Sequence, residues 1–310
     1  MSAVTPNALG LIGDTPLLAL SRIYQGPGTI LAKAEFVQPG GSVKDRPALR
    51  IIEDARASGR LTPGQPVVEM TSGNMGAGLA VVCNVLDHPF IVTISEGNSP
   101  ARARMLEALG AEVVLVPQVE GTPGCVSGAD IRVATARAIE IAQERQAFYV
   151  DQFNNPSCVN AHQTGTGPEI WAAVGERLDA FVAMVGTGGT FVGVSRFLKE
   201  KKPAVHCAAV EPQGAEVLAG KEVGKPCHLL QGTGYGLVPP QWDPSLVDSL
   251  LAVSDEEAAR FRWSLADEEG LYVGFSSAAN VCAAVKLLES GRLGEAPTVV
   301  TILCDTGLKY

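Results

Sequence analysis

Long apolar segments are missing from this 310-residue sequence, and so is any excess of positive charge. No stretch approaches the ~20 apolar residues that a membrane-spanning helix needs. Residues 1–10, MSAVTPNALG, also lack the basic and apolar regions of a signal peptide. We therefore expect a cytoplasmic protein without a membrane partner. The formal net charge of −9 argues against nucleic acid as a partner, because phosphate backbones attract basic surfaces.

Metal-binding patterns are missing as well. The seven cysteines contain no CxxC pair, and the four histidines have no metal-ligand spacing, so we expect no bound metal. Apolar residues make up 46% of the chain and charged residues 18%, which is typical of a globular protein with a sizeable core. These absences leave small molecules as the expected partners.

Short apolar runs alternate with helical patterns along most of the chain. The predicted strands are 29–36, 66–70, 90–95, 111–117, 147–151, 180–186, 205–212 and 297–305. The predicted helices include 45–59, 76–86, 99–110, 128–146 and 254–270. Such alternation indicates mostly parallel sheets covered by helices on both faces. We expect an α/β protein of two lobes, one of residues 40–150 and one of residues 1–39 and 151–310.

The segment MTSGNMGAGLA, residues 70–80, is typical of a strand end, a tight glycine-rich turn and the start of a helix. The polar residues Thr71, Ser72 and Asn74 occupy the turn, where backbone N–H groups at the helix start would point toward a ligand. Met75 is an unexpected apolar residue in the middle of this polar turn.

Lys44 precedes a second predicted helix start, in QPGGSVKDRPALR, residues 38–50. Pro47 falls in the first turn of this helix, which is a favoured place for proline. The positive end of a helix disfavours a cationic amine, and a neutral amine is what Schiff-base chemistry requires. The alternative is an ordinary solvated loop lysine.

Two further helix starts carry small polar residues. Gly186, Thr187, Gly188, Gly189 and Thr190 connect a strand to a helix, where N–H groups, two hydroxyls and the helix dipole form an anion cradle. The alternative there is a tight turn only. Ser276, next to Ser277, precedes a helix rich in small residues, and the alternative for this pair is helix capping.

Together these segments resemble the fold type II pyridoxal-phosphate enzymes, in particular the cysteine synthases and their cystathionine β-synthase relatives. The supporting stretches cover most of the chain and are LIGDTPLLAL (11–20), PGGSVKDR (39–46), TSGNMG (71–76), DQFNNP (151–156), GTGPEIW (165–171), GTGGT (186–190), QGTGYG (231–236), GFSSAA (274–279) and ILCDTGLKY (302–310). DQFNNP and ILCD look closest to the B-type cysteine synthases.

The resemblance implies a two-lobed fold like that of the tryptophan synthase β subunit, pyridoxal 5′-phosphate as cofactor, and a homodimer. Its smaller lobe, 40–150, would be mobile and carry the substrate-carboxylate turn, while the larger lobe would carry the phosphate turn. Lys44 would be both the catalytic and the cofactor-linked residue. The other cofactor-binding residues would be Asn74 at the ring oxygen, Ser276 at the ring nitrogen, and Gly186, Thr187, Gly188, Gly189 and Thr190 at the phosphate. The substrate-binding residues would be Thr71, Ser72, Met75 and Gln152.

The implied reaction is β-replacement on an O-activated L-serine, either O-acetylserine or O-phosphoserine, through an α-aminoacrylate. The product would be L-cysteine or a related β-substituted alanine. The alternative is a β-eliminating lyase of the serine/threonine dehydratase or cysteine desulfhydrase type. A binding protein on a degenerate scaffold is a third alternative, which the intact Lys44, Asn74 and Ser276 disfavour.

Met75 departs from the threonine that cysteine synthases usually carry at this position. A methionine side chain cannot donate a hydrogen bond to a carboxylate, so we expect Met75 to alter substrate specificity rather than catalysis. The alternative is that Met75 only packs against the helix behind the turn.

Overall fold

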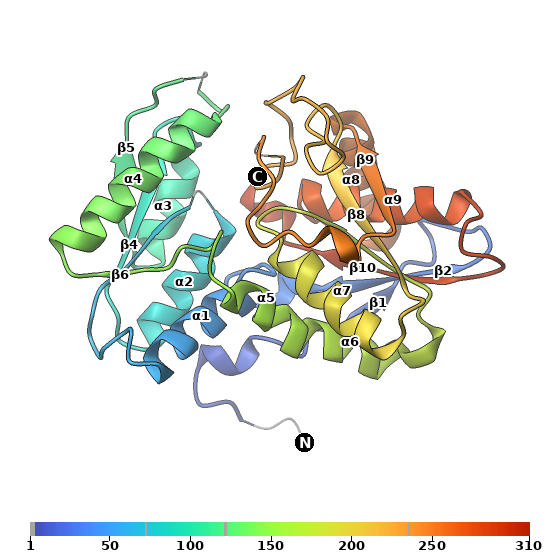
Figure 1. Cartoon of the computed structure of the whole chain (residues 1–310), viewed down its shortest axis with the longest axis horizontal. Helices are drawn as coiled ribbons and strands as arrows, with labels where there is room; N and C mark the ends of the chain where they lie inside the picture. The colour runs from blue at the N-terminus through green and yellow to red at the C-terminus, as the bar shows by residue number, and fades with distance from the viewer. Residues whose placement is uncertain (1–3, 72, 121–122, 235) are drawn as a thin grey trace. The chain divides into compact units, whose positions relative to one another are not determined.

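The computed structural model describes residues 4–71, 73–120, 123–234 and 236–310 (Figure 1). Ser72 therefore lies outside the described residues. The chain divides into two compact units. Unit 1 comprises Met1–Gly13 and Gln38–Cys158, and unit 2 comprises Asp14–Val37 and Val159–Tyr310. The mobility expected of the smaller lobe stays a prediction.

Unit 1 contains a four-stranded sheet in the order β5-β4-β3-β6, in which all strands are parallel. Its strands are β3 (Val67–Met70), β4 (Phe90–Ser95), β5 (Glu112–Val116) and β6 (Phe148–Tyr149). Its helices are η1 (Ala8–Leu11), α1 (Asp45–Ala57), α2 (Asn74–Val85), α3 (Pro100–Ala108) and α4 (Gly128–Glu144). Successive side chains of a strand point to opposite faces, so Val67 packs with α1 and α2 whereas Val68 packs with α4.

Unit 2 contains a six-stranded sheet in the order β1-β2-β10-β7-β8-β9. Only β1 is antiparallel to its neighbour. The strands are β1 (Leu17–Ala19), β2 (Thr29–Ala34), β7 (Ala180–Met184), β8 (His206–Pro212), β9 (Ser249–Val253) and β10 (Thr298–Leu303). Its long helices are α6 (Gly167–Val174), α7 (Gly189–Lys201), α8 (Asp255–Glu269) and α9 (Phe275–Glu289), and α5 (Ser157–Ala161) spans the sequence boundary between the units.

The two faces of the unit 2 sheet are covered by different helices. Ala180 and Val182 of β7 pack with residues of α8 and α9, which Figure 1 shows in orange and red. Phe181, on the opposite face of β7, stacks on Phe191 of α7 with 6.2 Å between ring centroids. The sheet is therefore buried on both sides, as the apolar strand sequences indicate.

Short helical turns complete unit 2. They are η2 (Glu35–Val37), η3 (His162–Thr166), η4 (Gly175–Arg177), η5 (Pro244–Leu246) and η6 (Gly307–Lys309), of which η3 is a π-helical turn.

The predicted α/β architecture with mostly parallel sheets is confirmed, and each predicted strand and helix has a counterpart in the structure. Two strands and two helices were not predicted. β1 has only three residues, β9 is half-buried, α5 has five residues, and α6 begins with the turn-like pair Gly167 and Pro168. Periodicity over a few residues is too short to distinguish such elements from loops.

Candidate active site

Lys44 immediately precedes α1, as predicted, and is half-buried. Its backbone N–H donates to Ser42 Oγ (3.2 Å), and its carbonyl accepts from Ala48 N (3.0 Å). α2 packs closely against the backbone of Lys44. A Cβ on Gly78 of α2 would lie only 3.1 Å from the Lys44 carbonyl oxygen. The glycine allows this approach, so two helices fix the backbone of Lys44.

The loop before Lys44 folds onto the first residue of α1. The backbone N–H of Gly40 donates to the buried carboxylate of Asp45, and a Cβ on Gly40 would lie only 2.5 Å from Asp45 Oδ1. A carboxylate at a helix N-terminus is stabilised by the helix dipole. The sequence GG therefore permits the compact loop that presents Lys44.

The unit 1 turn, residues 71–76, connects β3 to α2. Thr71 is buried and its Oγ1 accepts a weak hydrogen bond from Gly73 N (3.4 Å). Gly73 occupies the N-cap of α2 and brings no side chain to the N–H groups of the first helical turn. Asn74, the first residue of α2, is half-buried. The structure thus brings Thr71 and Asn74 to one helix start, as predicted.

Met75 is buried in the core of unit 1. Its side chain is 2% exposed and belongs to the apolar cluster that also contains Leu79, Leu106 and Cys158. This position favours the packing interpretation of Met75. Its role in substrate specificity stays a prediction.

Gln152 lies beside the unit 1 turn. Its Nε2 donates to the carbonyl oxygen of Met70 (3.3 Å), the last residue of β3. Glu69, the preceding residue, is also within reach of both amides of Gln152. Sequence reasoning did not identify Glu69; a charged residue in an otherwise apolar strand was the available signal.

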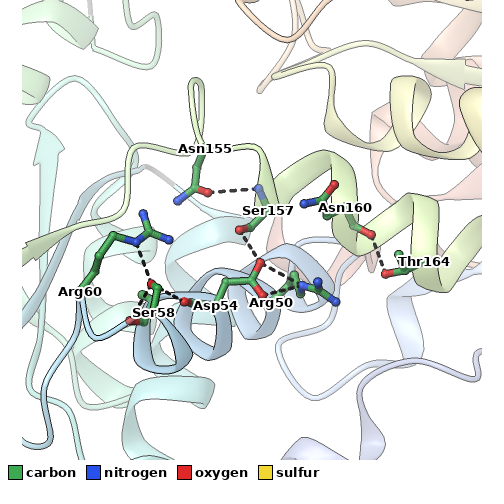
Figure 2. A network of polar contacts seen from close by, with 9 residues as sticks. Arg50, Asp54, Ser58, Arg60, Asn155, Ser157, Asn160 and Thr164 are labelled. Atoms are coloured by element: carbon green, nitrogen blue, oxygen red, sulfur yellow. Dashed lines mark hydrogen bonds and ion pairs between the residues drawn. The ribbon is translucent and has the colours of Figure 1, made fainter.

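A polar network joins α1 to the segment that follows Gln152 (Figure 2). Ser157 Oγ donates to Asp54 Oδ2 (2.7 Å), and Arg50 Nε donates to the same carboxylate (2.9 Å). Asn155 accepts from Ser157 N (3.1 Å) and donates to Val150 O (2.9 Å). These bonds from Ser157 and Arg50 contribute to a pKa of Asp54 below its ordinary value, against an opposing effect of burial. The network therefore joins the segment after Gln152 to α1, the helix that Lys44 precedes.

The unit 2 turn, residues 186–190, connects β7 to α7. Gly188 occupies the N-cap of α7 with φ +92°, a left-handed conformation that favours glycine. A Cβ on Gly186 would lie 2.5 Å from the carbonyl oxygen of Gly232, so only glycine fits there. Thr187 is buried, and Gly189 and Thr190 form the first turn of the helix. Hydroxyls and N–H groups therefore gather at one helix N-terminus, as an anion cradle requires.

His162 supports the unit 2 turn and was not identified from the sequence. Its Nε2 lies 3.2 Å from Thr190 Oγ1, and its Nδ1 lies 2.9 Å from Thr166 Oγ1. The ring is 1% exposed and sits on the π-helical turn η3, a type of turn that occurs frequently at functional sites. Only the tertiary fold brings His162 to a turn 28 residues away.

Ser276 lies in the first turn of α9. Capping is the wrong interpretation for both serines, because Gly274 is the N-cap residue. Ser277 is buried and its Oγ accepts from Asp305 N (3.4 Å). Ser276 is half-buried, and within the described residues its hydroxyl makes no hydrogen bond, so it can contact a ligand.

The predicted residues thus form two groups. Lys44, Thr71, Asn74, Met75 and Gln152 belong to unit 1, whereas the unit 2 turn and Ser276 belong to unit 2. In the part of the chain that the structure describes, His, Cys, Asp and Glu side chains form no group of three that could hold a metal ion. Over the same residues, every helix is too short or too polar to cross a membrane.

Comparison with known proteins places these features in a family. The family model described as "Pyridoxal-phosphate dependent enzyme" matches residues 8–305. A cysteine synthase of Staphylococcus aureus is 38% identical over 306 residues, which cover 98% of this chain and 94% of the relative.

Two solved structures extend the comparison. One is O-ureido-L-serine synthase, with 35% identity and a TM-score of 0.91 over 99% of this chain and 94% of that one. The other is a hydrogen sulfide-producing enzyme from Fusobacterium nucleatum, with 30% identity and a TM-score of 0.92 over 100% and 99% of the two chains.

Proposed function

Because the chain belongs to the family of pyridoxal-phosphate-dependent enzymes, we propose that it catalyses β-replacement on an O-activated L-serine. The substrate is O-acetylserine or O-phosphoserine, and the product is L-cysteine or a related β-substituted alanine. The observation that carries this proposal is the 38% identity to a cysteine synthase over nearly the whole chain. The enzyme is of the O-acetylserine sulfhydrylase type, and its cofactor is pyridoxal 5′-phosphate.

The residues of each unit fit this cofactor. The unit 2 turn offers the N–H groups at the start of α7 together with the hydroxyls of Thr187 and Thr190, which suits a phosphate. Ser276 offers a hydroxyl without a hydrogen-bond partner among the described residues, which suits the ring nitrogen. Lys44 offers the amine for covalent attachment, and Asn74 offers an amide for the ring oxygen.

The bound cofactor acts as an electron sink for the bonds at the α-carbon of the substrate. Lys44, when its amine is neutral, takes the proton from this carbon as a general base and later returns it. Ser276 is a neutral hydroxyl, so it does not stabilise a positive charge on the ring as a carboxylate would. A hydroxyl rather than a carboxylate at the ring nitrogen favours prompt loss of the β-substituent over transamination.

The unit 1 turn holds the carboxylate of the substrate in this proposal. Thr71 and Ser72 supply donors, and the backbone N–H of Met75 remains available to join them although its side chain is buried. The amide of Gln152, which donates to Glu69 and to the Met70 carbonyl, would redirect one of these weak hydrogen bonds to the carboxylate. N–H groups at a helix start favour an anion there.

A β-eliminating lyase is the second candidate function. It is favoured by the likeness to a hydrogen sulfide-producing enzyme. Such an enzyme would use the same residues but release the eliminated product to water instead of adding a nucleophile.

A product assay distinguishes the two functions. Holoenzyme is incubated with O-acetylserine, O-phosphoserine, serine or cysteine, with and without sulfide, and amino-acid and keto-acid products are quantified. We expect an L-cysteine product that requires sulfide and an activated serine. Pyruvate as the main product, at the same rate with and without sulfide, would assign the chain to the lyases instead.

We further propose a homodimer in the cytoplasm, by analogy with enzymes of this fold. Light scattering should give twice the mass of one chain, and a single-chain mass would refute the dimer.

A further inference from the structure

Glu69 is a buried acid that the proposed reaction does not use. It lies on β3, two residues before Thr71, and its side chain is 1% exposed. Its Oε2 accepts from the backbone N–H of Gln152 (3.4 Å), and its Oε1 accepts from Gln152 Nε2 (3.5 Å). Within the described residues it forms no ion pair. Glu69 therefore contacts Gln152, the residue proposed to bind the substrate carboxylate, and has no cationic side chain as a partner among the described residues.

Hydrogen bonds from Gln152 to Glu69 and Met70, and one from Cys158 to Gln152, hold the Gln152 side chain and backbone in place. Its Nε2 is shared between Glu69 and the Met70 carbonyl, and its own carbonyl accepts from Cys158 Sγ (3.3 Å). Glu69 contacts both the backbone and the side-chain amide of Gln152, so it controls the direction of that amide.

The surroundings of Glu69 disfavour a negative charge. Among the described residues, Asp151 and Tyr149 are the ionisable groups that interact with Glu69, and Cys158 contacts Gln152; none of these three supplies a positive charge. Burial is the largest influence on the pKa of Glu69 and raises it to about 8. The hydrogen bonds from Gln152 oppose this rise, whereas the nearby charge of Asp151 adds to it. Near neutral pH the side chain is therefore mainly a neutral acid.

The charge of Glu69 matters to an anion bound at the unit 1 turn. A neutral acid leaves the positive helix end of α2 unopposed, whereas a carboxylate at this depth would repel a second carboxylate. Binding of an anion must then favour the protonated acid, because the two equilibria are linked.

We propose that Glu69 is a positioning residue that orients Gln152 and takes up a proton when the substrate carboxylate binds to the unit 1 turn. The proposal rests on the proposed function for the placement of the carboxylate. The proton comes from solvent and returns to it when the ligand leaves, and no covalent bond changes.

The test uses propionate as the probe, because it has no amine and stays ionised above pH 6. Calorimetry of the holoenzyme at pH 8, in buffers of different ionisation enthalpy, measures the protons taken up on binding. We expect a fraction of a proton per site, and a dissociation constant that rises roughly five- to tenfold between pH 7 and pH 9.5.

Two variants assign the proton. Glu69→Gln keeps the size and shape of the side chain but removes its titratable group. This variant should abolish the proton uptake on propionate binding and make the dissociation constant independent of pH. Tyr149→Phe is the matched control, because the Tyr149 phenol makes no hydrogen bond to Gln152 among the described residues and the uptake should persist.

Three results would overturn the proposal. They are absence of propionate binding, absence of proton uptake by the wild type between pH 7 and 9, and uptake that persists in Glu69→Gln. The wild-type measurement is sufficient even if Glu69→Gln does not fold. Failure of the proposed function would appear separately, as a lack of turnover of both activated serines by the wild type.

Discussion

The two glycine-rich turns have the same local backbone arrangement, but different side chains pack behind them. Each follows a parallel strand and opens a helix, with glycine at the N-cap. The unit 1 turn contains an apolar core residue, Met75, and follows a strand that carries a buried acid, Glu69. A buried histidine, His162, supports the unit 2 turn through Thr190. In our proposal the first turn holds an exchangeable monoanion and the second a permanently bound phosphate.

In this comparison, the N–H groups at a helix start attract an anion, and the buried residues behind the turn determine how strongly each anion is bound. In our proposal, the protonation of Glu69 would make anion binding at the unit 1 turn depend on pH. A histidine hydrogen-bonded to Thr190 fixes the hydroxyl of the unit 2 turn in one direction. The variants below test each part of this comparison, from the largest expected effect to the smallest.

Replacement of Lys44 should have the largest effect. Lys44→Ala removes the proposed base, so kcat/KM should fall by at least roughly 10³-fold while unit 2 still binds the cofactor non-covalently. Borohydride reduction and peptide mapping of the wild type should place the cofactor on Lys44. Lys221→Ala, at an exposed position, is the control and should keep full activity. A label on another lysine would exclude Lys44 from this role.

Replacement of Gly186 tests the unit 2 turn alone. A Cβ there would meet the Gly232 carbonyl oxygen at 2.5 Å, so Gly186→Ala must displace the turn. Overpacking costs about 1–3 kcal/mol, and the cofactor should dissociate roughly ten- to a hundredfold more readily. Equilibrium dialysis measures this constant. Gly128→Ala is the control, because the nearest atom to its Cβ would be Nη1 of Arg132 at 3.5 Å, an ordinary contact distance. Equal affinity in both variants would remove Gly186 from the phosphate site.

Replacement of Met75 separates packing from specificity in the unit 1 turn. Met75→Thr removes a buried apolar side chain and should lower the free energy of unfolding by about 2–3 kcal/mol, whereas Met75→Leu should cost under about 1.5 kcal/mol. Denaturant titration measures both. Kinetics on a panel of activated serines should change by the same factor for every substrate. A selective gain in kcat/KM for O-acetylserine of about tenfold or more would instead establish the specificity role.

Replacement of His162 should have the smallest effect. His162→Asn removes the partner of Thr190 Oγ1, which costs about 1 kcal/mol, or roughly a fivefold increase in the dissociation constant of the cofactor. Fluorescence titration of the apoenzyme measures this change. His206→Asn is the matched control, because His206 also lies near a hydroxyl, Ser249 Oγ at 2.8 Å, on β8 and β9. An equal change in both variants would show that His162 acts on stability only.

The sequence alone determined most of the elements and the two turns. Strands of four or more apolar residues and long helices with clear start signals are local features. The helix predicted over 254–270 is present as α8, which begins with a capping box of Ser254 and Glu257 and ends at Gly270. Lys44 before a helix and the five residues of the unit 2 turn were also identified from local patterns. Short elements such as β1 and α5 were missed because few residues carry their pattern.

Only the tertiary structure decided what stands behind each turn. The sequence marks Met75 and Glu69 as unusual for their positions but does not say why they are there. In the fold, Met75 packs in the cluster that contains Leu79, and burial beside Gln152 raises the pKa of Glu69. His162 and Gly274 likewise acquired their roles from packing. Burial and hydrogen-bond partners depend on segments far apart along the chain, whereas helix starts and strand patterns depend on neighbours within a few residues. The sequence therefore determined where the two helix starts and their glycine-rich turns lie, and the fold determined which residues stand behind them.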